Sequence, residues 1–170
     1  SSGLAVSDSS SQTSVVTISA NTVTRVRQGT TTIIASEAGN SDYNAAPSVS
    51  QTLTVNKKTF TITGTTVAPK VYDASAMSGA ITLGTISGLI GAETVTVTAT
   101  GLYADANAGI GKIATVSYTL ADGANGGLAS NYSLAGEILT GNIIPKDLNI
   151  SGTTIADKVY DASAVSGVVT

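Results

Sequence analysis

The stretch GTTVAPKVYDASA, residues 64–76, returns almost unchanged as GTTIADKVYDASA, residues 152–164. The two copies lie 88 residues apart and agree at eleven of thirteen positions. The differences are Val67 against Ile155, a conservative apolar exchange, and Pro69 against Asp157, both acceptable in a turn or at a strand edge. A segment that recurs at a fixed interval is typical of an array of similar structural units.

The same interval defines the limits of one unit. Lys58 and Lys146 are also 88 residues apart, and each opens an alternating run, KTFTITG and KDLNISG. We therefore expect a complete unit at residues 58–146 and the opening strands of a further unit at residues 147–170. Residues 1–57 have a different sequence and are expected to form a separate β module.

Apolar and polar residues alternate with a period of two along most of the chain, which predicts strands. Gly-rich turns separate these runs, and no segment has helical periodicity. The predicted strands are 14–20, 22–27, 30–36 and 48–56 in the first module, and 79–86, 94–100, 112–119 and 137–144 in the central unit. Because this spacing is that of a small β-sandwich, the sequence predicts an all-β protein.

The composition argues against several functional classes. The chain has 8 Lys and Arg against 11 Asp and Glu, so no basic stripe is available to neutralise nucleic-acid phosphates. It has no Cys and no His, which removes disulfides, thiolate chemistry, the usual general base and the commonest metal ligand. No apolar run approaches the roughly 20 residues that span a bilayer. We expect no nucleic-acid partner and no transmembrane segment.

The central unit resembles the YDG and MBG ("mostly β-grasp") repeats, which occur with Ig-like modules in tandem in very large bacterial surface adhesins of the filamentous-haemagglutinin type. The motifs that carry the resemblance are ITGTTVAPKVYDASA, TGLYADANAGIGK, SNYSL and IIPK, in this order. Residues 30–57 are similar to the closing half of an Ig-like or MBG module, which implies that residues 1–57 lack their first strands. The resemblance implies tandem small β-sandwich or β-grasp-like domains in an elongated array.

The family signature Tyr-Asp-Gly is altered in both copies. It is Tyr72-Asp73-Ala74 in the first copy and Tyr160-Asp161-Ala162 in the second. Because alanine is disfavoured at positive φ, we expect no left-handed conformation at this position.

The tyrosines are the first candidate binding residues, because a repeated Tyr-Asp pair could stack on a sugar and bond to it. The interpretation we favour is structural, since every repeat must solve the same folding problem. In that interpretation Tyr72 packs on the inter-sheet core and Asp73 closes a turn on its own backbone. Tyr43 and Tyr132 each precede the last strand of a module, where we expect structural tyrosine corners.

Two loops offer oxygen ligands and raise the question of calcium. They contain Asp105 with Asn107, and Asp122 with Asn125. A calcium site needs six to eight oxygens and usually several carboxylates, whereas each loop has a single Asp. We expect both to be turns and predict no metal site.

Three further patterns in the sequence have ordinary explanations. Residues 109–114 fit a loose GxGxxG/A pattern, but a strand and not a helix is expected to follow, so no dinucleotide site is predicted. Sequons at residues 131–133 and 149–151 are no more than chance supplies. Lys57, Lys58 and Lys146 could form isopeptide bonds if buried beside Asn and an acid, but solvated lysines at strand edges are the default.

No catalytic residues and no cofactor are expected, because no Ser-Lys pair, activated Thr or acidic pair stands out. We therefore expect a structural stalk or fibre repeat of a large extracellular bacterial adhesin or filament protein. Its partners would be adjacent repeats or identical subunits joined head to tail. The alternative is an adhesive module that itself binds glycan or a host or matrix protein.

Overall fold

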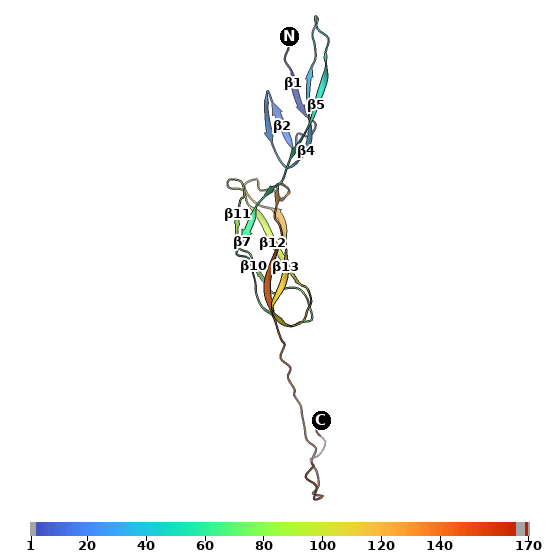
Figure 1. Ribbon diagram of the computed structural model, residues 1–170, viewed down its shortest axis with the longest axis vertical. Coiled ribbons are helices and arrows are strands. Elements are labelled where there is room, and N and C mark those ends of the chain that lie inside the picture. The colour runs from blue at the N-terminus through green and yellow to red at the C-terminus, as the bar shows by residue number, and fades with distance from the viewer. Residues whose placement is uncertain (1–2, 166–168, 170) are drawn as a thin grey trace.

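The computed structural model describes residues 3–165 and residue 169. The chain is elongated, with one group of strands at the N-terminal end, a second group in the middle and an extended trail beyond it (Figure 1). Strands and loops make up nearly all of it, and the described residues include one short 3-10 helix, η1, at Ala129–Asn131. The predicted all-β class is confirmed. No helix among the described residues is long and apolar enough to cross a membrane.

The N-terminal strand group contains five strands. They are β1 (Ser7–Ser10), β2 (Val16–Ser19), β3 (Thr22–Arg25), β4 (Gly29–Glu37) and β5 (Ala46–Val55). Strands β1, β4 and β5 form an antiparallel sheet, and β2 and β3 form a separate hairpin. Four of these strands lie where alternation predicts them, whereas β1 was not predicted because SDSS is uniformly polar.

The interior of this group is small. Val15 and Val16 are buried, and Thr31 on β4 is 2% exposed. Its hydroxyl lies 2.8 Å from the Ser10 hydroxyl and accepts the backbone N–H of Gln12 at 3.0 Å. These hydrogen bonds satisfy a polar group that would otherwise be costly to bury.

The central strand group contains ten strands. They are β6 (Lys58–Thr59), β7 (Thr61–Thr63), β8 (Thr66–Val67), β9 (Lys70–Val71), β10 (Ile81–Thr82), β11 (Thr85–Ser87), β12 (Val95–Tyr103), β13 (Gly109–Asp122), β14 (Tyr132–Ser133) and β15 (Glu137–Ile144). Its main sheet has the order β12-β13-β15-β9, and smaller pairs join β10 to β8, β11 to β7 and β14 to β6.

Two parallel pairings join the beginning of this group to its end. Lys70 on β9 pairs with Ile143 on β15, and Lys58 on β6 pairs with Tyr132 on β14. Parallel pairing cannot be made by a tight hairpin and needs a long connection. Strands near the beginning of residues 58–144, β6 and β9, are therefore held by strands near its end, β14 and β15.

The central core is built from alternating residues of the main sheet. On β12 the inward Val95 and Val97 are buried while the intervening threonines are exposed. They pack with Phe60, Ile62 and Tyr132, and the rings of Phe60 and Tyr132 meet edge to face at 5.9 Å and 86°. This aromatic geometry is favourable beyond the area it buries.

The C-terminal segment beyond β15 behaves differently. Residues 145–165 contain no strand and are exposed throughout, and one isolated bridge joins Ile155 to Val169. The strands expected to open a further unit are thus not paired in this structure. In the first copy the corresponding strands pair with strands between residues 81 and 144.

Candidate functional site

The repeated KVYDASA segment forms a loop around a lysine. The ammonium of Lys70 lies 2.6 Å from the carboxylate of Asp73 and donates to the carbonyl oxygens of Ser75 and Met77, both at 2.9 Å. The Asp73 carboxylate also accepts the backbone N–H of Ser75 at 3.0 Å. Because the Lys70 side chain is only 11% exposed, its charge is compensated within the loop.

The second copy forms the same loop without a surrounding sheet. Lys158 lies 2.9 Å from Asp161 and donates to the carbonyl of Val165 at 2.9 Å. Asp161 again accepts the N–H of the serine two residues later, Ser163, at 3.0 Å. Since residues 145–165 are exposed and unpaired by strands, the loop conformation follows from local hydrogen bonds.

The expectation about the altered signature is wrong. Ala74 has φ of 63° and Ala162 has φ of 60°, so both alanines are left-handed. Such a conformation costs a non-glycine residue roughly 1–2 kcal/mol. Hydrogen bonds span this residue in the first copy, from the Ser75 N–H to Asp73 and from Lys70 to the Ser75 carbonyl.

In both loops the lysine lowers the pKa of the neighbouring aspartate. Hydrogen bonding to Lys70 lowers the pKa of Asp73 below its ordinary value of 3.8, and the bond from the Ser75 backbone lowers it further. Lys158 and the Ser163 backbone lower the pKa of Asp161 in the same way. Both carboxylates are therefore ionised at neutral pH and act as turn closures, as predicted for Asp73.

The tyrosine of the signature is not in the core. Tyr72 is 39% exposed and Tyr160 is 91% exposed. The predicted packing of Tyr72 between sheets is wrong because its backbone continues β9, where its N–H donates to the carbonyl of Ile144 at 2.8 Å.

Tyr132 is a buried structural residue as predicted, but its hydroxyl bonds to residues 39 and 42 positions earlier and not to nearby backbone as in a tyrosine corner, and Tyr43 is not buried. The Tyr132 side chain is 1% exposed, and its hydroxyl donates to Glu93 at 2.6 Å and accepts the backbone N–H of Ile90 at 3.1 Å. Burial, and then the bond to Glu93, raise the pKa of Tyr132. Tyr43 is 53% exposed, so its ring does not pack into the N-terminal interior.

Both loops examined for calcium are turns. The Asp105 carboxylate accepts the N–H of Asn107 at 2.8 Å and binds the ammonium of Lys112 at 2.5 Å, which also donates to the Asn107 carbonyl. The hydrogen bond from the lysine lowers the pKa of Asp105, and the ion pair compensates the charge of the carboxylate. Asp122 accepts the N–H of Ala129 at 2.7 Å, which closes the second turn.

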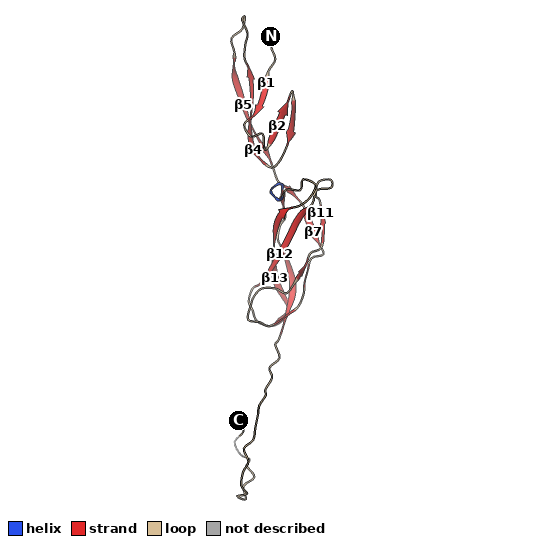
Figure 2. Cartoon of the chain, turned by 180° about the vertical axis from the view of Figure 1, so that it is seen from behind, coloured by secondary structure: helices blue, strands red, loops and turns tan. Residues whose placement is uncertain are grey.

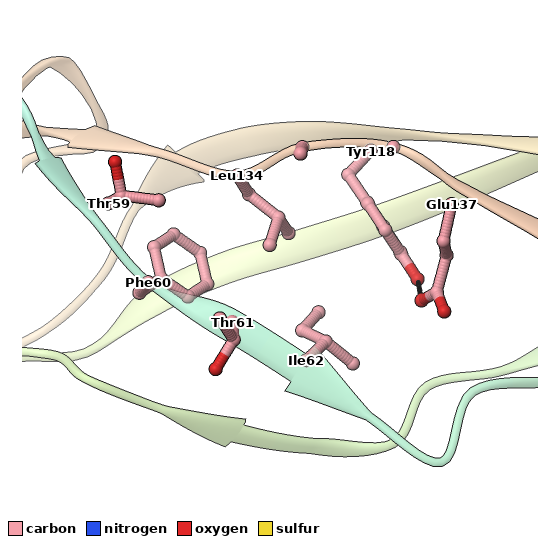
Figure 3. A pocket seen from close by; sticks show the side chains of 9 residues that line it. Thr59, Phe60, Thr61, Ile62, Tyr118, Leu134 and Glu137 are labelled. Carbon is pink, nitrogen blue, oxygen red and sulfur yellow. Dashed lines mark hydrogen bonds between the residues drawn. The ribbon is translucent and has the colours of Figure 1, made fainter.

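A small cavity of about 230 Å³ lies between β7 and β15 (Figure 3). Its walls include Phe60, Ile62 and Leu134, and at one end the hydroxyl of Tyr118 donates to the carboxylate of Glu137. Thr65 lies 3.0 Å from the same hydroxyl and, since the tyrosine proton is engaged, serves as the donor. Burial and the bond to Glu137 raise the pKa of Tyr118.

This polar group was not predicted, because its members are 19 and 53 residues apart and no motif links them. It has one carboxylate and two hydroxyls and joins neighbouring strands across the sheet. In the part of the chain that the structure describes, no three Asp or Glu residues come together. The geometry is that of a tie between strands, and it lacks a nucleophile with an adjacent base.

The remaining patterns have ordinary structural positions. Lys57, Lys58 and Lys146 are all exposed, as the default interpretation required, so none is buried beside an acid as isopeptide formation needs. Residues 109–114 lie within β13, which confirms the expected strand after the GxGxxG pattern. Of the two sequons, residues 131–133 include the buried Tyr132, whereas residues 149–151 are exposed.

The central strands are similar to a known protein family. Residues 56–138 match the YDG domain. The YDG domain detected here covers β6 to the start of β15 and contains the Lys70 loop, the Tyr118 cavity and the Tyr132 hydroxyl bonds. No curated protein and no solved structure matched the chain. The YDG part of the expected resemblance is confirmed for residues 56–138.

Proposed function

We propose that this chain is part of the stalk or fibre of a large extracellular bacterial adhesin or filament protein, and that it is not an enzyme. The observation that carries the proposal is the repeated loop, which closes in the same way around Lys70 and around Lys158. A loop that recurs after 88 residues serves the folding of successive units and not the recognition of one ligand.

The joint between the two strand groups supports a stalk role. Only Asn56 and Lys57 separate the end of β5 from the start of β6. The backbone N–H of Gln28 donates to the side-chain oxygen of Asn131 at 2.9 Å, which ties the N-terminal group to η1 of the YDG domain. Figure 2 shows η1 beside this joint. A short linker with a side-chain tie restricts bending.

The exposed C-terminal segment supports the proposal that the partner is an adjacent repeat or an identical subunit. Leu148, Ile150 and Ile155 occupy the positions that Phe60, Ile62 and Val67 occupy 88 residues earlier. Phe60 and Ile62 are buried in the core of the YDG domain, and Val67 packs against Tyr103 and its neighbours. Residues 147–170 thus carry apolar side chains that would enter the core of a further unit. The remaining strands of that unit would come from an adjacent repeat or from an identical subunit joined head to tail.

The role can be tested on intact cells of the source organism. Antibodies against residues 58–144 should label the surface, and mild external proteolysis should release the antigen. Denaturing electrophoresis of the released or intact material then separates the two partner arrangements. A band near 17 kDa supports separate subunits, and only very large species support one long chain. Antigen confined to the cell interior would contradict the proposal.

Direct adhesion is a second candidate, and one observation favours it. The outer face of β12, β13 and β15 is uncharged, and Leu102, Thr115 and Ile138 form one cross-strand row on it. Leu102 is 53% exposed and Ile138 is 72% exposed. Exposed apolar residues in a polar surround are typical of contact surfaces. Saturable binding to glycan or matrix-protein arrays that L102T and I138T abolish would support adhesion, and its absence would exclude it.

A further inference from the structure

A cleft of about 380 Å³ lies at the joint between the N-terminal strand group and the YDG domain. One wall comes from the end of β3 and the residues after it, and the other from β6 and the segment around η1. The charged residues that line it are Arg25, Arg27, Lys58 and Glu93. Cations from both strand groups therefore face one space.

The three cations of the cleft are among five that form no ion pair within the described residues, and the other two, Lys57 and Lys146, do not line the cleft. Of the eight Lys and Arg, Lys70, Lys112 and Lys158 form the ion pairs found among residues 3–165 and 169. Arg25, Arg27 and Lys58 form no ion pair in that part of the chain and are exposed. In an acidic protein with net charge −3, three unpaired cations around one cleft are a local excess of positive charge.

The single acid in the cleft does not neutralise this excess. The Glu93 carboxylate accepts the hydroxyl proton of the buried Tyr132 at 2.6 Å, so one of its oxygens is already engaged. Counting Glu93 as −1, the three cations leave a net charge of about +2. Arg27 donates one N–H to the Ser14 hydroxyl at 3.3 Å, which orients its guanidinium and leaves its remaining donors free.

We propose that this cleft binds a multivalent oxyanion, a group with carboxylate, sulfate or phosphate oxygens. The guanidinium groups of Arg25 and Arg27 would take its oxygens as paired N–H donors, and the ammonium of Lys58 would supply a point charge from the opposite wall. Because Arg25 and Lys58 belong to different strand groups, the bound anion bridges the joint. This inference does not depend on the stalk role.

The test is a titration of the 15N-labelled chain followed by amide chemical shifts. Sodium sulfate, sodium phosphate and sodium citrate are added separately, with sodium chloride at matched ionic strength as the reference. We expect saturable shifts at the backbone amides of Gln28 and Asn131, which join the two walls. A stronger response to sulfate and phosphate assigns the natural group to a tetrahedral oxyanion, and a stronger response to citrate assigns it to a carboxylate.

Two variants and a control decide the outcome. R25Q/R27Q should weaken binding at least tenfold, and R25K/R27K should weaken it less because charge is kept while paired donors are lost. K146Q removes an exposed lysine outside the cleft and should leave affinity within twofold of the parent. Shifts that match those in chloride, or that R25Q/R27Q leaves unchanged, would overturn the proposal. Far-UV circular dichroism checks that each variant is folded.

Discussion

The ammonium of Lys70 lies 2.6 Å from the carboxylate of Asp73, and this contact organises the loop that the chain contains twice. The pair is three residues apart in sequence, and the lysine also holds the carbonyls of Ser75 and Met77. The loop is thus a local structure with its own charge balance. Its consequences for stability can be measured in the YDG domain.

Protonation of Asp73 at low pH should lower the free energy of unfolding. Its pKa is lowered on folding by Lys70, so the stabilisation is present above the unfolded value near 3.8 and is lost as pH falls through the lower folded pKa. We expect D73N to have a lower free energy of unfolding than the parent at pH 7. Between pH 4 and pH 2 the free energy of unfolding should fall less steeply in D73N than in the parent. Urea unfolding across this range measures it, with D8N on the exposed strand β1 as the control. An unchanged acid slope in D73N would contradict the assignment.

Replacing Ala74 by glycine should stabilise the protein. The left-handed φ of 63° costs alanine roughly 1–2 kcal/mol, and glycine adopts it freely but loses about 0.5–1 kcal/mol more entropy on folding. We expect a net gain of about 0.5–1 kcal/mol in the free energy of unfolding. The control is A104G at an exposed alanine without positive φ, which should lose about 0.5 kcal/mol. A loss of stability in A74G would refute the strain argument.

Two buried tyrosines should respond oppositely to loss of the hydroxyl. Y132F leaves the Ile90 N–H and the Glu93 carboxylate without a partner and should cost about 1–3 kcal/mol. The Tyr103 hydroxyl is buried and has no hydrogen-bond partner within the described chain, so Y103F should be neutral or stabilising by about 1 kcal/mol. Thermal or urea unfolding of both variants provides the comparison. Equal losses would mean that the two hydroxyls are satisfied alike.

Gly141 should be intolerant of a side chain because of Tyr103. A Cβ at this position would collide with the Tyr103 hydroxyl and come within 3.1 Å of a Val67 methyl. We expect G141A to cost about 1–3 kcal/mol by overpacking. In a Y103F background the cost should be smaller, since the colliding atom is gone. A double-mutant cycle measures the coupling, and strict additivity would show that the hydroxyl is not the obstacle.

The joint should loosen when Asn131 loses its side-chain oxygen. That oxygen accepts the N–H of Gln28 at 2.9 Å across the joint. We expect N131A to broaden the distribution of maximum dimensions in small-angle X-ray scattering, while the YDG domain stays folded. N131D keeps an acceptor and is the matched control. If N131A and the parent give the same distribution, the bond does not restrict the joint.

Much of the fold could be predicted from residue patterns. The run at residues 137–144 became β15 with the same limits, because alternation needs no long-range information. The polar group of Thr65, Tyr118 and Glu137 could not be predicted from residue patterns, since it depends on how β13 and β15 pair. The backbone bond from Tyr72 to Ile144, which is 72 residues later, likewise could not be predicted.

Residue patterns were sufficient to predict the all-β class, the 88-residue interval and the Asp-closed loop, because each depends on residues within a few positions or on simple repetition. The parallel pairing of β9 with β15 and the meeting of Arg25 and Lys58 at one cleft are visible in the tertiary structure alone. Those features arise where distant segments meet. Their energies depend on pairing and packing across the chain, which alternation along one segment does not encode.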